Sequence, residues 1–279
     1  GPTATGTQYS VNLDITRACN GINPPARWTV NWTGSCGSGS VSLVRQSITD
    51  ITPSCSGQSA CSGGGGTIGV EQHYYTGIIV VPFNCTNVIF STRSCCRNNS
   101  ITSLVSSPAM YLELPVTNNL QPCNNSPTFT NPPLSFICLN EPVVYNVGGV
   151  DFDGDSLNYV LVPCEDNANS SVPYQAGYSG TAPFGASTPV TINPQTGEIR
   201  FTPTTLNVSP VCIEIEEYRN GVLIGSSIRD MTVHVVNCTN SNPSLSGING
   251  SSSYEVTTCY GTQLCFDIIG SDTSDPMDI

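Results

Sequence analysis

The sequence predicts an all-β fold built from tandem, disulfide-stapled β-sandwich domains. Short segments of the chain alternate apolar and polar residues with a period of two, which is typical of half-buried strands. No window of a dozen residues sustains the 3.6-residue period of a helix. The 26 glycines and 21 prolines supply the turns between short strands, and the 14 cysteines supply the staples.

The clearest strands can be placed in chain order. Apolar residues alternate at residues 9–15, 41–45, 157–162, 211–217 and 231–236. Asn220-Gly221 lies between two such segments and predicts a two-residue hairpin turn, since both turn positions require a positive φ. A second turn is expected at residues 193–197, directly before a strand at residues 198–201.

The charge balance excludes nucleic acid as a partner. The chain has 20 acidic and 8 basic residues and a net charge of -12, and every basic residue is an arginine. Nucleic-acid binding depends on neutralising phosphates with Lys and Arg. No apolar run approaches the roughly 20 residues that cross a bilayer, so no membrane-spanning segment is expected.

The cysteines predict an extracellular location. No C-x-x-C spacing occurs, and the chain has only 2 histidines, so zinc-finger sites are not expected. An even number of cysteines in an acidic chain rich in Asn, Thr and Ser is typical of a disulfide framework formed in an oxidising compartment. We therefore expect a secreted protein at the cell surface.

An internal repeat suggests the domain organisation. The segment that begins at Pro122 corresponds to the one that begins at Asn237. Cys138 and Asp151 are separated by 13 residues, as are Cys259 and Asp272. We expect a cysteine-rich sandwich at 3–121, a sandwich module at 122–238, and the truncated start of a further repeat at 239–279.

Two disulfide schemes remain open. Residues 3–121 contain seven cysteines, so at least one must pair outside that domain or stay free, and Cys123 is the nearest candidate. The repeat instead suggests the local pairs Cys123–Cys138 and Cys238–Cys259, with Cys164–Cys212 stapling the middle module. The two schemes conflict over Cys123.

Three carboxylates at alternate positions form the clearest candidate site. Asp151, Asp153 and Asp155 precede a strand, and like charges this close repel unless a counter-charge is present. Calcium accepts oxygen ligands of this kind. The spacing is not that of an EF-hand, because Val162 stands where the bidentate glutamate should be. The alternative is a solvated acidic turn in which Gly154 supplies the positive φ.

A second candidate site is a carbohydrate-binding surface. A glycine-rich stretch at residues 55–66 precedes His73, Tyr74 and Tyr75. Aromatic faces beside polar side chains can stack on sugars, so a lectin-like module of a secreted protein is the alternative function. The other interpretation is a surface loop followed by core tyrosines.

The motifs do not favour an enzyme. The sequence lacks a G-x-S-x-G elbow, an H-E-x-x-H zinc motif and a phosphate-binding glycine loop. Glu214 and Glu216 alternate on one strand, which is more typical of a solvated face than of a glycosidase pair.

Several motifs resemble those of known surface proteins. The chain resembles a cadherin-like or Ig-like module of bacterial surface proteins at residues 124–129, 150–155, 157–159 and 196–203. In cadherins, linker Asn/Asp residues, a glutamate and an Asp-x-Asp pair hold calcium between domains. The resemblance therefore implies that Asp151 and Asp153 are calcium ligands and that Asn125 is a linker ligand. The linker at residues 120–125 lacks the carboxylates of the cadherin pattern.

With residues 95–98, 135–138 and 217–225 added, nearly the whole chain is similar to the SprB-type giant adhesins of Bacteroidota, which are associated with gliding motility and exported by type IX secretion. This resemblance implies a segment of a long surface filament that supports attachment and gliding. The partners it implies are surface glycans or other extracellular ligands and neighbouring repeats of the same chain.

Overall fold

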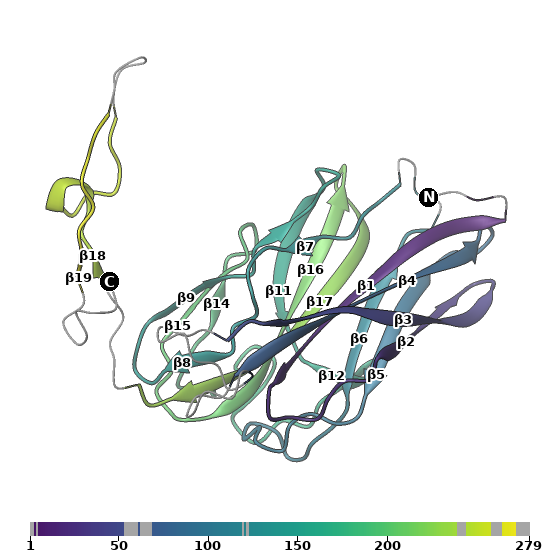
Figure 1. Cartoon of the computed structure of the whole chain (residues 1–279), viewed down its shortest axis with the longest axis horizontal. Helices are drawn as coiled ribbons and strands as arrows, with labels where there is room; N and C mark the ends of the chain where they lie inside the picture. The colour runs from purple at the N-terminus through teal and green to yellow at the C-terminus, as the bar shows by residue number, and fades with distance from the viewer. Residues whose placement is uncertain are drawn as a thin grey trace. The chain divides into compact units, whose positions relative to one another are not determined.

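The structure is a computed structural model, and it describes residues 3, 5–52, 61, 69–118, 120, 123–238, 244–257 and 264–271. These residues form an all-β protein that divides into two compact units, Gly1–Val235 and Val236–Ile279 (Figure 1). No α-helix occurs among them, so none of their helical turns is long and apolar enough to cross a membrane.

The first unit is built on one long antiparallel sheet. Its strands follow the order β1-β4-β3-β2-β5-β6-β17-β16-β11. The N-terminal half of the unit contributes six strands: β1 (Gly6–Ala18), β2 (Arg27–Gly34), β3 (Gly37–Asp50), β4 (Val70–Pro82), β5 (Val88–Ser94) and β6 (Met110–Val116). β2 shows the expected alternation of buried and exposed side chains along its length, whereas β3 is mostly exposed and β6 is mostly half-buried.

The C-terminal half of the first unit contains eight short strands and three longer ones. The short strands are β7 (Thr128–Phe129), β8 (Phe136–Cys138), β9 (Val143–Asn146), β10 (Gly149–Val150), β12 (Glu165–Asn167), β13 (Ser170–Ser171), β14 (Thr191–Ile192) and β15 (Glu198–Phe201). The longer strands are β11 (Ser156–Val162), β16 (Val208–Arg219) and β17 (Val222–Val236). Asn220 and Gly221 both have positive φ, 53° and 78°, so the expected hairpin turn joins β16 to β17.

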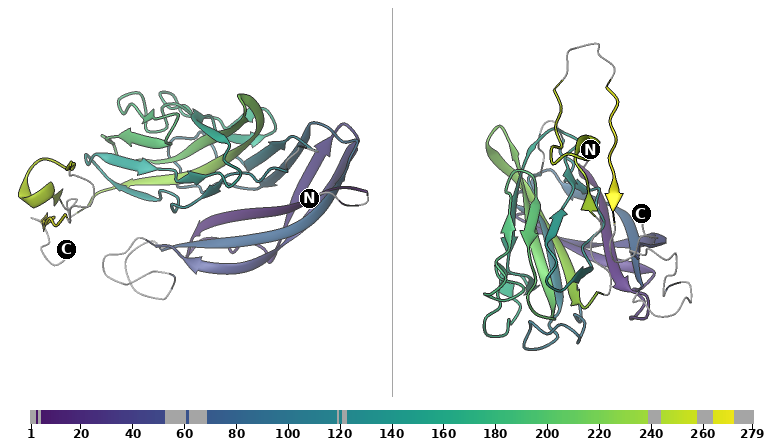
Figure 2. Two further views of the ribbon diagram at one scale, coloured as in Figure 1. Left: turned by 90° about the horizontal axis from the view of Figure 1, so that it is seen from above. Right: turned by 90° about the vertical axis from the view of Figure 1, so that its left-hand side faces the viewer.

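The sheet of the N-terminal half curls over its own core. Tyr9 on β1 packs edge-on against Phe90 on β5, with ring centroids 5.2 Å apart, although β4, β3 and β2 separate these strands in the sheet. Trp28 and Tyr75 meet inside the same core at 5.8 Å. Figure 2 shows β1, β3 and β4 as one layer that curves away from the strands of the other half.

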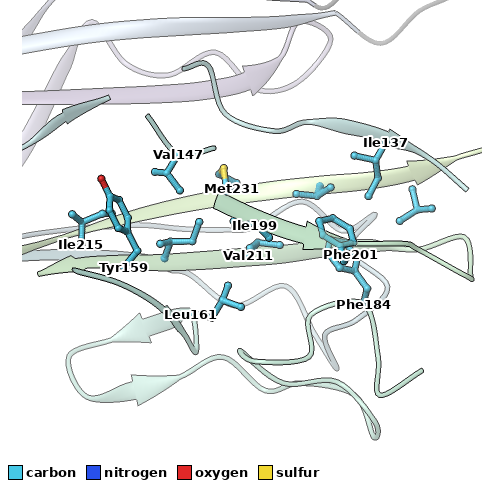
Figure 3. Close-up of a cluster of buried hydrophobic side chains, with 13 residues drawn as sticks. Ile137, Val147, Tyr159, Leu161, Phe184, Ile199, Phe201, Val211, Ile215 and Met231 are labelled. Atoms are coloured by element: carbon cyan, nitrogen blue, oxygen red, sulfur yellow. The ribbon is translucent and has the colours of Figure 1, made fainter. Parts of the chain in front are cut away.

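A second core lies between two sheets of the C-terminal half (Figure 3). The three-stranded sheet β14-β15-β9 covers the face formed by β11, β16 and β17. Ile199 and Phe201 from the small sheet pack against residues such as Ile213 and Val233 from the large one. Phe201 also stacks on Phe184 at 4.6 Å. This half is therefore a β-sandwich, as the sequence predicted.

The two halves share strands at their junction. β6 pairs along its length with β5 and meets β17 at Val116 and Gly225. A third cluster of buried side chains, which includes Leu104, Cys164 and Cys212, lies where the loop after β5 packs against the other half. The boundary expected between residues 121 and 122 thus separates two cores but falls inside one compact unit.

The second unit has little regular structure among its described residues. β18 (Ser244–Leu245) pairs with β19 (Gly270–Ser271), and a 3₁₀ turn spans Ile248–Gly250. Large apolar side chains such as Leu245 and Ile269 are exposed. The described part of this unit therefore lacks a buried core of its own.

Candidate functional site

The acidic turn between β10 and β11 brings three carboxylates together. Asp151, Asp153 and Asp155 each present an oxygen within 4.8 Å of the others. Asp151 Oδ1 accepts the backbone N–H groups of Asp153 and Asp155, both at 2.9 Å. Gly154 has a φ of 81°, which allows the chain to wrap around that carboxylate.

An arginine from the β16–β17 hairpin faces this turn. Arg219 Nε donates to Asp155 Oδ1 at 2.8 Å, and its Nη2 donates to Asp155 Oδ2 at 2.6 Å. The same Nη2 lies 3.9 Å from Asp153 Oδ2. These hydrogen bonds hold the pKa of Asp155 below its usual value. Arg219 therefore supplies part of the positive charge that offsets the repulsion among the three carboxylates.

The linker before β7 is attached to the acidic turn. Asn125 donates its backbone N–H to Asp153 Oδ2 at 2.6 Å and its Nδ2 to Asp153 Oδ1 at 3.1 Å. Asn124 accepts a hydrogen bond from Arg219 Nη2 at 2.6 Å through its Oδ1. Asn125 thus lies at the site, as the resemblance implied, but its amide is a donor to Asp153 in this arrangement.

Glu217 is, after Arg219, a second site residue that the sequence did not reveal. Its side chain is almost fully buried, with 1% of the residue exposed, and its Oε1 accepts a hydrogen bond from Asn124 Nδ2 at 2.5 Å. Burial first, and then the charges of Asp151 and Asp155, raise the pKa of Glu217 to about 7. The neighbouring Glu216 points elsewhere and accepts from Asn158 and Tyr218.

The long-range register of the sheet explains why Arg219 and Glu217 were missed. Ser156 pairs with Tyr218 across β11 and β16, so Asp155 and Arg219 are neighbours across the two strands. A register shift lies between Glu217 and Tyr218. The Asn220-Gly221 turn was the only local signal, because it fixes where β16 ends but not which strand β16 pairs with.

The unsatisfied groups of this site suit a hard cation. Four carboxyl groups surround one guanidinium group, so negative charge remains after Arg219 is counted. Asp151 Oδ2 is buried and, while Glu217 is ionised, accepts no hydrogen bond from the described residues. A protonated Glu217 hydrogen-bonds to Asp151 instead. Arg219 already binds both oxygens of Asp155. Asp151 and Asp153, together with an ionised Glu217, are therefore the residues that could hold a cation such as calcium, which binds carboxylate oxygens.

The described disulfides staple both halves of the first unit. Cys164 and Cys212 are joined in the C-terminal half, which is the pair that the sequence analysis expected. The N-terminal half contains three further bridges, Cys19–Cys61, Cys36–Cys85 and Cys95–Cys96.

Cys123 is free and exposed, so both pairings considered for it are wrong. Its segment before β7 is held instead by Asn124 and Asn125. Cys138 and Cys238 are each disulfide-bonded, whereas Cys259 lies outside the described residues.

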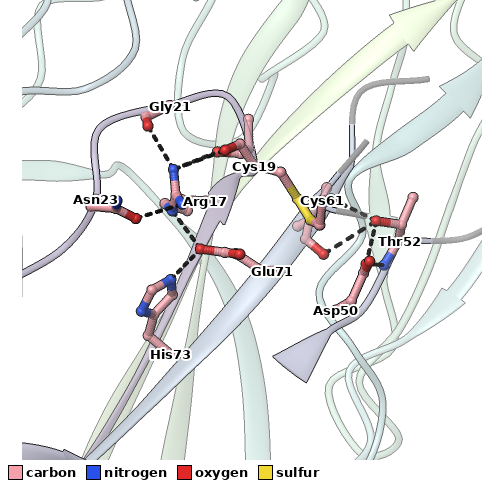
Figure 4. The surroundings of a disulfide bond; sticks show 11 residues. Arg17, Cys19, Gly21, Asn23, Asp50, Thr52, Cys61, Glu71 and His73 are labelled. Carbon is pink, nitrogen blue, oxygen red and sulfur yellow. Dashed lines mark hydrogen bonds and ion pairs between the residues drawn. A yellow bond between two sulfur atoms is a disulfide. The ribbon is translucent and has the colours of Figure 1, made fainter. Parts of the chain in front are cut away.

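The aromatic cluster considered for sugar binding is mostly buried. His73 and Tyr75 are both 0% exposed. Tyr75 donates its hydroxyl to Pro25 O at 2.8 Å, and His73 Nε2 lies 2.6 Å from Glu71 Oε1, beside Arg17 and the Cys19–Cys61 bridge (Figure 4). Tyr74 faces outward and donates to Asn12 Oδ1. The prediction of a shared sugar-stacking surface is therefore wrong, because alternate residues of β4 point into the core.

Comparisons with known proteins assign no family to this chain. No family model matches the chain, and no curated protein matches it. Among solved structures it is similar to the I-band fragment I67-I69 from titin, with 7% sequence identity and a TM-score of 0.22. That match covers 83% of this chain, and the chain spans 60% of the titin fragment.

Proposed function

We propose that the chain is a load-bearing segment of a secreted surface filament that supports attachment and gliding. The observation that carries this proposal is the junction of the first unit, where two separately stapled halves share one sheet. A disulfide within each half limits how far that half can extend under tension. The continuous sheet and the buried contacts at β6 and β17 resist bending between the halves.

The junction also contains a buried ion pair. Arg97 follows β5, and its Nη1 donates to Asp230 Oδ1 on β17 at 2.9 Å. Only 4% of each side chain is exposed. A rigid link between modules is what a filament requires and is not needed for a catalytic role, so we propose a mechanical function and no enzymatic one.

We further propose that calcium reinforces this segment at the acidic turn. Bound there, the ion would neutralise the carboxylates that Arg219 leaves unpaired. Asp151 and Asp153 would bind it, with Glu217 beside them in its ionised form. Since Asn125 is attached to Asp153, ordering this turn also orders the linker between the halves.

Titration calorimetry tests the calcium proposal. The double variant Asp151→Asn/Asp153→Asn should lose calcium binding and the accompanying rise in melting temperature. Glu198→Gln is the matched control, because it removes an acidic group from the surface of β15, outside the acidic turn. Equal melting temperatures with calcium and with a chelator would overturn the proposal.

A cell experiment tests the filament. In cells that carry the gene, the segment should react with a membrane-impermeant label before lysis, and its in-frame deletion should lower the fraction of cells that stay attached under flow. Labelling that requires lysis, or unchanged attachment, would contradict the proposed role. The buried positions of His73 and Tyr75 leave no observation in favour of the lectin-like alternative.

A further inference from the structure

Within the part of the chain that the structure describes, no strand pairs with the outer edge of β1 over its central residues. β1 lies at the end of the long sheet and, among the described residues, pairs only with β4. Cys19 continues the register of that pair, and its N–H donates to Gly69 O at 2.9 Å. Because an antiparallel ladder alternates, odd-numbered residues of β1 direct their backbone groups toward β4 and even-numbered residues direct theirs away.

Both ends of the open edge are closed by local hydrogen bonds. At the N-terminal end, Gly6 O accepts from Thr3 N at 2.7 Å. At the other end, Ala18 O accepts from Gly21 N at 2.8 Å and from the Arg17 side chain. These carbonyl groups belong to even-numbered residues, which agrees with the alternation.

Five even-numbered residues lie between these closed ends. Gln8 has a further interaction of its own, and the other four, Ser10, Asn12, Asp14 and Thr16, direct their backbone groups outward. Their side chains are all exposed. Natural edge strands are protected by charged side chains, Pro or bulges. This stretch has no Pro and no bulge, and Asp14 is its single charged residue.

We propose that β1 pairs antiparallel with β1 of a second copy of this chain, around a two-fold axis at Leu13. This register places Asn12 opposite Asp14 and Ser10 opposite Thr16 of the second copy. All four open residues then pair, giving about eight backbone hydrogen bonds. An antiparallel edge contact of this kind is self-complementary, as a two-fold dimer requires.

The side chains agree with this register. Asp14 is the only charged residue in the paired stretch, and it faces an amide rather than another carboxylate. Asn12 Oδ1 already accepts from Tyr74 and Thr76, so its amide N–H groups remain to donate to Asp14 of the second copy. On the core side, Leu13 is only half-buried, and Leu13 of the other chain would cover it.

The net charge of each chain opposes the dimer. Two bodies that each carry a charge of -12 repel each other, and salt screens that repulsion. The dimer should therefore form at high protein concentration and strengthen as the NaCl concentration rises.

Sedimentation equilibrium of the full chain at several NaCl concentrations tests the proposal. We expect Asn12→Pro to weaken dimerisation at least tenfold, because it removes an outward N–H and leaves the ladder to β4 intact. Thr76→Ala is the matched control: it removes a side-chain partner of Asn12 without changing the edge, and it should dimerise as the parent does. A purely monomeric parent, or equal dimerisation by Asn12→Pro, would overturn the proposal.

Cysteine crosslinking tests the register even if the proline variant fails to fold. In a Cys123→Ser background, Leu13→Cys should form a residue-13 to residue-13 disulfide between chains, which mass spectrometry can map. Val11→Cys should not crosslink to itself, because it faces Ile15 of the second copy. Equal crosslinking by both variants, or by neither, would overturn the proposed register.

Discussion

Arg97, in the loop after β5, binds both carboxylate oxygens of Asp230 on β17. The two residues are 133 positions apart in sequence, and each belongs to a different half of the first unit. Arg97 Nη2 also contacts Glu165 O at 3.4 Å. One guanidinium group thus connects three segments of the junction that we propose to bear load.

Removing one partner of this pair should be costly. Asp230→Asn leaves a buried, uncompensated guanidinium group, and we expect it to lower the free energy of unfolding by about 3–5 kcal/mol. Urea denaturation measures the change. The control variant is Arg200→Met, which breaks the exposed ion pair between Arg200 and Glu198. It should lower the free energy of unfolding by at most about 1 kcal/mol. Similar losses for both variants would show that the buried pair does not stabilise the junction.

Glu217 should make stability depend on pH in the absence of calcium. Its folded pKa of about 7 lies above the ordinary value of 4.5, so the folded state binds a proton that the unfolded state has released. The free energy of unfolding should therefore fall as pH rises from about 4.5 to 7 and stay constant above that. The total fall should be about 1.4 kcal/mol for each unit by which the folded pKa exceeds the unfolded one.

The Glu217→Gln variant isolates this effect. Thermal unfolding in chelator at several pH values should show a shallower fall in the variant than in the parent. Glu198→Gln, on the surface, should keep the parent's slope. An unchanged slope in Glu217→Gln would show that this carboxyl group does not titrate in the window.

Gly197 should tolerate no side chain. It has a φ of 70°, and a Cβ there would lie 2.8 Å from Cε1 of the buried Tyr159 ring. We expect Gly197→Ala to lower stability by about 2–4 kcal/mol, since strain and a clash in the core act together. At Gly221, with a φ of 78° and open space around the added atom, alanine should cost only about 1 kcal/mol. Equal losses at both positions in thermal unfolding would contradict the role of Tyr159.

The strands and turns could be predicted because their signals are local. Alternation identified β11, β16 and β17, and Asn220-Gly221 identified the hairpin between two of them. The same alternation, applied to β4, would have placed His73 and Tyr75 on the buried face that also carries Val81. The nearby glycine-rich stretch led instead to the prediction of an exposed aromatic surface.

The rest depends on contacts between distant residues. The acidic turn was visible in sequence, but Arg219 and Glu217 reach it only through the pairing of β11 with β16. The boundary at residue 121 was expected from a repeat and a cysteine-rich segment. Neither signal could reveal that β6 would join the sheet of the following half at Gly225.

The central claim is that an oxidised, stapled chain works mechanically outside the cell, and its bridges can be measured directly. Native protein from its own source should be alkylated without reduction, digested and analysed by mass spectrometry. The account predicts linked peptides for Cys36–Cys85 and Cys164–Cys212, with Cys123 alkylated. Alkylation of most cysteines, including these four, would contradict it.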